Sequence, residues 1–132
     1  MSQENVELVQ RAYERATASL EMPLELYDPD LVLDAREVSP DFGVVSGREA
    51  AQETLRGYWQ MFDDYRVEVA ELIHADEKHV VNVALDRGRI RGSQSEASNR
   101  YFHVWTFAAG RIVRLAIHSD RTRALEAVGL GG

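Results

Sequence analysis

The chain has 132 residues, 45% of them hydrophobic and 28% charged, which indicates one folded domain and argues against disorder. Its net charge of −7 makes nucleic acid and acidic membranes poor partners, and the absence of cysteine excludes disulfides, thiolate zinc ligands and a thiol nucleophile. The first residues lack the basic start and apolar core of a signal peptide, and no apolar run approaches the roughly 20 residues that cross a bilayer, so we expect a cytoplasmic protein without membrane contacts.

The chain begins with an amphipathic pattern. Apolar residues recur at steps of three and four from Val6 to Leu20, which predicts a helix with one buried stripe. Pro23 ends this helix because proline cannot continue the hydrogen-bonded backbone. A single helical turn over residues 24–27 and a turn over residues 28–30 are expected to follow.

The next segment predicts a strand and a loop. Residues 31–37 alternate so that Val32, Asp34 and Arg36 share one face, which we expect to line a cavity. Residues 39–47 contain a proline and two glycines and are interpreted as a loop.

A second helix is predicted after this loop. Ser46 and Glu49 have the spacing of a capping box, in which the serine caps the helix and the glutamate bonds back. The helix is expected to end at Asp63 and Asp64. Its apolar face carries three aromatic residues, Tyr58, Trp59 and Phe62.

From Tyr65 onward the apolar pattern has a period of two, which is typical of strands joined by turns. We expect strands over residues 66–74, 79–86, 96–107 and 111–119, a polar loop over residues 87–95, and a short last helix capped by Asp120. The third of these strands places a row of rings on one face: Tyr101, His103, Trp105 and Phe107. Strands joined in this way pair antiparallel, so the fold class is α+β, a curved antiparallel sheet wrapped around N-terminal helices as a cone with an internal pocket.

Five segments carry a family resemblance: the helix from Val6 to Tyr13, Leu31-Val32-Leu33-Asp34, Gly47-Arg48-Glu49-Ala50, the hairpin from Phe107 to Ile112, and the tail from Asp120 to Leu130. In this order they resemble the SnoaL-like branch of the nuclear transport factor 2 superfamily over nearly the whole chain. The resemblance implies one domain over residues 1–130, a frayed tail at 131–132, a pocket between the first helices and the concave sheet face, and a homodimer through the outer sheet face.

The superfamily includes ketosteroid isomerases, polyketide cyclases, dehydratases and non-catalytic binders. By resemblance to the isomerases, Tyr13 matches a tyrosine oxyanion donor, Asp34 matches the aspartate base, and His103 stands where those enzymes have a second acid. By resemblance to the cyclases, Ser119 stands where an aspartate is expected. The resemblance therefore leaves the reaction open.

Each candidate residue has a functional and a structural interpretation. Asp34 is either a general base in an apolar pocket or the structural partner of Arg36. His103 either donates a hydrogen bond to a ligand oxygen or is a core histidine satisfied by Tyr13. Five further aromatic side chains are interpreted as pocket walls or ligand contacts: Tyr58, Trp59, Phe62, Tyr101 and Trp105. Arg36, on the same strand face as Asp34, is a further candidate ligand contact.

Two other histidine clusters are given structural interpretations. His118, Ser119 and Asp120 are adjacent on a strand, so their side chains cannot form a hydrolase triad. His74 and His79 lack the spacing of a metal site.

The sequence and the resemblance thus predict one of two functions. The first is a cofactor-independent acid/base enzyme (isomerase, cyclase or dehydratase) that acts on a small apolar carbonyl-type compound, with Asp34, Tyr13 and His103 as catalytic residues. The second is a non-catalytic protein that binds a small apolar or polycyclic ligand. A direct bond between Arg36 and Asp34 would favour binding, and a free Asp34 among apolar groups would favour catalysis. A dimeric accessory protein with a pocket filled by its own side chains is the third hypothesis.

Overall fold

The structure is a computed structural model that describes residues 2–39, 41 and 43–130, so the expected tail at 131–132 lies outside it. Within the described residues the helical segments are α1 (Ser2–Ser19), η1 (Leu24–Leu26, a 3-10 turn), α2 (Arg48–Trp59) and α3 (Arg121–Glu126). The strands there are β1 (Tyr27–Asp34), β2 (Val44–Ser46), β3 (Phe62–Ala75), β4 (His79–Ile90), β5 (Glu96–Ala108) and β6 (Arg111–His118). None of the described helices is long and apolar enough to cross a membrane.

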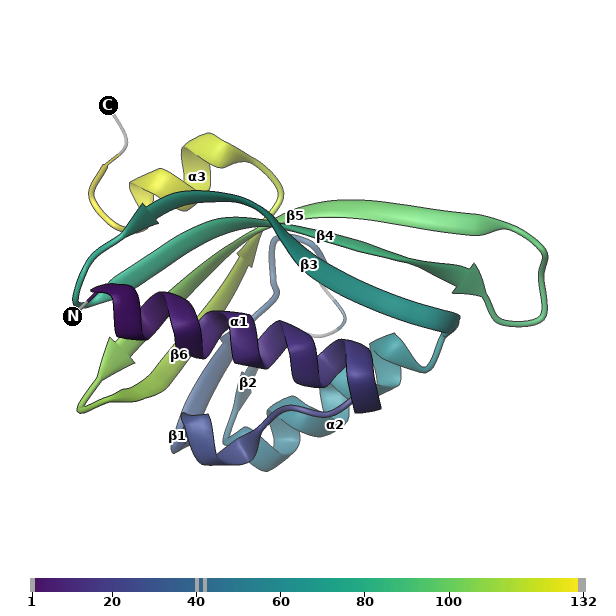
Figure 1. Cartoon of the computed structure of the whole chain (residues 1–132), viewed down its shortest axis with the longest axis horizontal. Helices are drawn as coiled ribbons and strands as arrows, with labels where there is room; N and C mark the ends of the chain where they lie inside the picture. The colour runs from purple at the N-terminus through teal and green to yellow at the C-terminus, as the bar shows by residue number, and fades with distance from the viewer. Residues whose placement is uncertain (1, 40, 42, 131–132) are drawn as a thin grey trace.

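One curved, open sheet organises the molecule, with the strand order β2-β1-β6-β5-β4-β3. The helix α1 lies along its concave side and α3 covers the opposite side (Figure 1). This arrangement follows from the period of two along β4, because Val80 packs into the core beneath α1 while its neighbour Val81 packs beneath α3. The predicted α+β class with a curved sheet around N-terminal helices is confirmed.

The strand pairing agrees with the sequence for the last four strands and goes beyond it for the first two. β3, β4, β5 and β6 pair antiparallel in sequence order, as expected. β1, however, pairs parallel with β6, and the three-residue strand β2, inside the segment that was expected to be a loop, pairs with β1. These pairings join segments that are far apart in the sequence or very short, so no local turn pattern indicates them.

Several predicted boundaries are wrong for identifiable reasons. Residues 28–30 are part of β1 and not a free turn, and α2 ends at Trp59, so that Phe62 opens β3. The capping box is absent: Gly47 is the N-cap of α2, at a φ of 99° that favours glycine, and no side chain caps the helix. The cap at Asp120 is confirmed, because its side chain accepts a hydrogen bond from the backbone of Arg123.

The predicted loop over residues 87–95 begins too early, since β4 continues to Ile90 and only residues 91–95 connect it to β5. Gly88 was interpreted as a loop residue, but it allows β4 to approach β3 closely. A Cβ atom at this position would lie 2.9 Å from the Cβ of Phe62. The glycine therefore marks a close approach of two neighbouring strands, β3 and β4, and not a turn.

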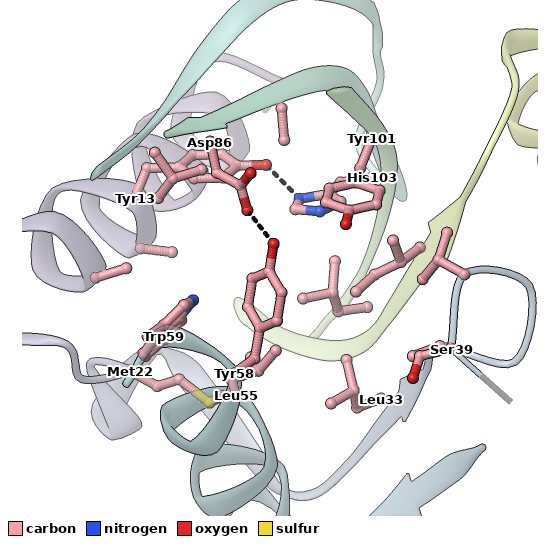
Figure 2. Close-up of a pocket in the computed structure, with 18 of the residues that line it drawn as sticks. Tyr13, Met22, Leu33, Ser39, Leu55, Tyr58, Trp59, Asp86, Tyr101 and His103 are labelled. Atoms are coloured by element: carbon pink, nitrogen blue, oxygen red, sulfur yellow. Dashed lines mark hydrogen bonds between the residues drawn. The ribbon is translucent and has the colours of Figure 1, made fainter. Parts of the chain in front are cut away.

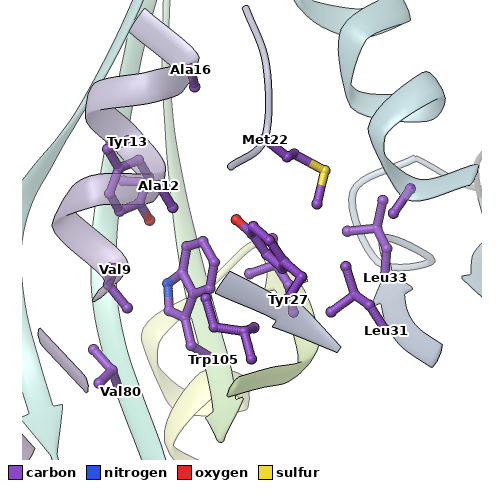
Figure 3. Close-up of a cluster of buried hydrophobic side chains, with 14 of the residues drawn as sticks. Val9, Ala12, Tyr13, Ala16, Met22, Tyr27, Leu31, Leu33, Val80 and Trp105 are labelled. Carbon is purple, nitrogen blue, oxygen red and sulfur yellow. The ribbon is translucent and has the colours of Figure 1, made fainter. Parts of the chain in front are cut away.

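The main core lies between α1 and the concave side of the sheet (Figure 3). Leu31 and Leu33 of β1 are fully buried there, beside Tyr27 and Trp105. The buried face of β1 is thus the one that carries Leu31 and Leu33, and not the face that carries Asp34.

Candidate functional site

A cavity of about 430 Å³ lies between α1, α2 and the concave face of the sheet (Figure 2). This volume is within the range of small-molecule sites. Apolar and aromatic side chains make most of its wall, among them Met22, Leu33, Leu55, Trp59 and Trp105. The space between the helices and the sheet is thus not filled by the protein's own side chains, whereas the hypothesis of a dimeric accessory protein required a filled pocket.

Four side chains at one end of the cavity form a chain of hydrogen bonds. Asn82 and His103 face each other across β4 and β5, and Tyr13 reaches them from α1. The indole N–H of Trp105 lies 2.9 Å from Oδ1 of Asn82, and Nδ2 of Asn82 lies 2.8 Å from the hydroxyl of Tyr13. That hydroxyl lies 2.6 Å from Nδ1 of His103.

The direction of this chain follows from the chemistry of tryptophan. An indole N–H can only donate, so Asn82 must turn its oxygen to Trp105 and its amide group to Tyr13. The Tyr13 oxygen accepts that bond, and since Nδ1 of His103 is the one acceptor within reach of the Tyr13 hydroxyl among the described residues, the hydroxyl donates its proton there. A neutral His103 therefore carries its proton on Nε2.

His103 is held as a neutral imidazole. Burial, with a smaller contribution in the same direction from nearby His118, lowers its pKa to about 3. Burial raises the pKa of Tyr13, so its hydroxyl keeps its proton. In the part of the chain that the structure describes, no group hydrogen-bonds to Nε2 of His103, while the imidazole lines the cavity. This end of the cavity offers a ligand one N–H donor.

The other polar end of the cavity is Asp86, which the sequence analysis did not single out. Its side chain is buried, with 3% of the residue exposed. Oδ2 accepts hydrogen bonds from the hydroxyls of Tyr58, at 2.8 Å, and Tyr65, at 3.0 Å. Oδ1 is buried and has no partner among the described residues. The alternation of β4, which puts Asn82, Ala84 and Asp86 on one face, is the signal that would have found it.

Asp34 lies outside the cavity lining, so the expectation that its face of β1 lines the pocket is wrong. Leu33 and Ala35 line the cavity instead. The carboxylate of Asp34 receives Nε and Nη2 of Arg36 at 3.0 and 2.8 Å, and Nη2 of Arg114 at 2.6 Å. The hydrogen bonds from Arg36 hold the pKa of Asp34 below its usual value despite partial burial. Both faces of this strand carry apolar residues, so alternation alone did not decide which face is buried.

A model of the SnoaL-like domain matches residues 9–115. The chain belongs to this family. No curated protein is significantly similar to it in sequence.

Solved structures with the same fold are similar to this SnoaL-like domain over almost their whole length. A protein from Jannaschia sp. CCS1, assigned as a SnoaL-like polyketide cyclase, is 19% identical, with 96% of this chain and 90% of that chain covered and a TM-score of 0.75. A ketosteroid isomerase-like protein from Catenulispora acidiphila, in complex with trimethylamine, is 17% identical (94% and 93% covered, TM-score 0.70). TerC, co-crystallised with polyporic acid, is 22% identical (94% and 96% covered, TM-score 0.72). At these identities the similarity shows the fold alone.

The remaining predicted ligand contacts of this SnoaL-like domain are divided between the cavity and its surroundings. Tyr58, Trp59, Tyr101 and Trp105 line the cavity. Phe62 lies behind Tyr58, with ring centroids 5.3 Å apart, and is not among the lining residues. Arg36 is paired with Asp34, is 68% exposed in its side chain and is not among the lining residues.

The cluster at the end of β6 is built around a glutamate and is not a triad. One carboxylate oxygen of Glu37 lies 2.8 Å from Nδ1 of His118, and the other accepts from the backbone and hydroxyl of Ser119, each at 2.9 Å. Ser119 is thus bonded to the acid and not to the histidine. Among the described residues no group of three or more acidic or histidine side chains could hold a metal ion.

Proposed function

We propose that this SnoaL-like domain binds a small, largely apolar organic molecule whose oxygen atom accepts a hydrogen bond from Nε2 of His103. The observation that carries this proposal is the unpartnered N–H of a neutral histidine, held in one tautomer by Tyr13, at the wall of a ligand-sized cavity. The Catenulispora and TerC structures, which contain trimethylamine and polyporic acid, support a pocket for a small organic molecule. The bond between Asp34 and Arg36 favours binding over catalysis by Asp34.

The apolar walls supply most of the affinity in this scheme. A single neutral hydrogen bond contributes about 0.5–1.5 kcal/mol net. Burying apolar ligand surface contributes about 25 cal/mol per Å². His103 therefore decides orientation and discriminates between ligands several-fold, while Trp59, Trp105 and Leu33 provide the contact area.

A pair of ketone and hydrocarbon tests the proposal. Calorimetry would compare 1-indanone with indane, which lacks the oxygen, on the wild type, on His103→Phe, and on His79→Phe as a control outside the cavity lining. We expect the wild type and the control to bind the ketone several-fold more tightly than the hydrocarbon, and His103→Phe to bind both equally. Equal binding by the wild type would refute the role of His103, and no binding of either probe would argue against the pocket function.

Acid/base catalysis is the second candidate function, and the buried, unpartnered oxygen of Asp86 favours it. In this scheme Asp86 accepts a proton from carbon next to a carbonyl group. His103, with Tyr13 behind it, stabilises the negative charge that develops on the carbonyl oxygen. No cofactor takes part. Asp34 has no role in the proton transfer, because two arginines hold it outside the cavity lining.

Deuterium exchange separates the two functions. The α-protons of 1-indanone in D₂O, followed by proton NMR, exchange faster in the presence of an enzyme of this type. Catalysis predicts that exchange is lost in Asp86→Asn and kept in Asp34→Asn. An exchange rate equal to that of buffer alone, with the ketone bound, would leave binding as the function.

We also propose that the protein is a cytoplasmic homodimer, as the family resemblance implies. Light scattering after gel filtration tests the assembly. A dimer has twice the chain mass of 14.9 kDa. A particle with the mass of one chain would refute it.

A further inference from the structure

The charge of the cavity is one-sided. Its lining residues include Asp86 and Asp41 and, among the described residues, neither lysine nor arginine. Its histidine, His103, is neutral. The cavity therefore repels anions and has no side chain that neutralises a carboxylate.

The negative charge of Asp86 has no positive partner among the described residues. Tyr58 and Tyr65 provide two hydrogen bonds, both to Oδ2, and Oδ1 is shielded from water without a partner. Arg87, the next residue of β4, is exposed and makes no bond to Asp86 within the described part of the chain. The arginines further along are paired elsewhere, Arg89 with Asp64 and Arg91 with Asp63. A carboxylate that is removed from water without a counter-charge destabilises a protein by several kcal/mol. Such a cost is recovered when a ligand brings the missing positive charge.

Aromatic rings surround the same end of the cavity. Tyr65 packs against Tyr58 and Trp59, with both pairs of ring centroids 6.1 Å apart, and against Phe62 at 5.7 Å. The faces of such rings attract cations, most strongly where water is excluded. The carboxylate and the rings therefore both attract a positively charged ligand.

The two polar ends address different parts of a ligand. His103 pairs with Asn82 across the strands, and Asp86 is four residues further along the same face of β4. At about 3.3 Å per residue the backbone positions of the two ends are roughly 13 Å apart along the strand. A ring system with a polar group at each end matches this spacing.

We infer that the cavity selects a cationic amine: an aromatic or cyclic compound whose protonated nitrogen lies at the Asp86 end and whose oxygen or ring faces His103. This inference rests on the proposed function and names its ligand class. The neutral and anionic analogues of such an amine bind less well, because the first leaves Asp86 uncompensated and the second adds a like charge.

Three indole probes of one shape but different charge test this inference: tryptamine (cation), tryptophol (neutral) and indole-3-acetate (anion). Calorimetry at pH 7 would measure each on the wild type. We expect tryptamine to bind at least about tenfold more tightly than tryptophol, and indole-3-acetate to bind most weakly. This order needs no variant, so it holds even where a substitution disturbs folding.

Substitution then assigns the charge preference to one residue. Asp86→Asn should bind tryptamine and tryptophol within about twofold of each other, with tryptophol retained as the sign of a folded pocket. Asp30→Asn, the same change at an exposed position of β1, should keep the wild-type preference.

The outcomes separate the two claims. Equal binding of tryptamine and tryptophol by the wild type, or tighter binding of indole-3-acetate, overturns the cationic class while the pocket itself stands. A preference that persists in Asp86→Asn overturns the role of Asp86. If none of the indoles binds but 1-indanone does, the amine class is wrong and the proposed function holds. If 1-indanone also fails to bind, both are wrong.

Discussion

The hydroxyl of Tyr13 donates a hydrogen bond to Nδ1 of His103 over 2.6 Å and accepts one from Asn82 over 2.8 Å. One phenol therefore both satisfies a buried amide and sets the tautomer of the histidine that faces the cavity. The two interpretations of His103, a core histidine satisfied by Tyr13 and a donor to a ligand, are compatible, because Tyr13 occupies only one of its two ring nitrogens.

The first prediction concerns this pair. In the wild type we expect nitrogen NMR to show His103 neutral and protonated on Nε2 from pH 5 to pH 8, because burial lowers its pKa to about 3. In Tyr13→Phe no hydroxyl fixes the proton on Nε2, so the imidazole of His103 should populate both neutral tautomers. The amide of Asn82 also loses its acceptor, which should lower the free energy of unfolding by about 1–3 kcal/mol. Unchanged nitrogen shifts in Tyr13→Phe would show that Tyr13 does not determine the tautomer.

The second prediction concerns Asp34 and its two arginines. Arg36 has 68% of its side chain exposed, so Arg36→Ala should change the free energy of unfolding only slightly, because Asp34 keeps Arg114. Asp34→Asn removes the negative charge and one of the two acceptor oxygens that the arginines share, and should cost more, about 1–3 kcal/mol. Urea unfolding measures both.

Binding of 1-indanone is the control for that pair of variants. Since Asp34 is not part of the cavity lining, both variants should bind the ketone like the wild type. A large loss of affinity in Asp34→Asn, with the fold intact, would return Asp34 to the site.

These residues show how far the sequence led and where it stopped. The row of rings on β5 and the tyrosine of α1 could be predicted to meet, because alternation and helical periodicity each place them on one face. Asp34 was assigned to the wrong face. Apolar residues stand on both faces, Leu31 and Leu33 on one and Val32 on the other, so the pattern does not decide which face points into the core. Asp86 was missed because a single aspartate at a strand end does not reveal the two tyrosines that meet it in space.

The third prediction is an acid-induced loss of stability that depends on Glu37. Burial raises the pKa of this group, but hydrogen bonds from Ser119 and His118 outweigh it and lower the pKa to about 2, from 4.5 for the free side chain. A lowered pKa stabilises the fold above the unfolded-state value, so this contribution is complete above about pH 4.5. It is lost as the pH falls toward 2. A shift of this size corresponds to about 3.4 kcal/mol, which screening by solvent reduces to roughly 2 kcal/mol.

Glu37→Gln tests this dependence. Its unfolding free energy should be lower than that of the wild type at pH 7, and the gap should narrow between pH 4.5 and pH 2. Glu14→Gln, at an exposed position of α1, should follow the wild-type curve. A gap that stays constant over this range would mean that the charge of Glu37 contributes nothing to stability.

The fourth prediction compares two glycines that the same substitution affects in opposite directions. Gly88→Ala places a Cβ atom 2.9 Å from the Cβ of Phe62 and 3.3 Å from the carbonyl oxygen of Asp63, so β3 and β4 must separate. We expect a loss of about 1–3 kcal/mol in the free energy of unfolding. Gly57 lies within α2, and a Cβ there meets no atom within 4 Å, so Gly57→Ala should stabilise the protein by about 0.5–1 kcal/mol.

Because Phe62 packs against Tyr58 and Tyr65, which hold Asp86, Gly88→Ala should also weaken ligand binding, whereas Gly57→Ala should not. Denaturant unfolding and calorimetry on the two variants measure both effects, and equal stability of the two would contradict a close approach of the strands at Gly88.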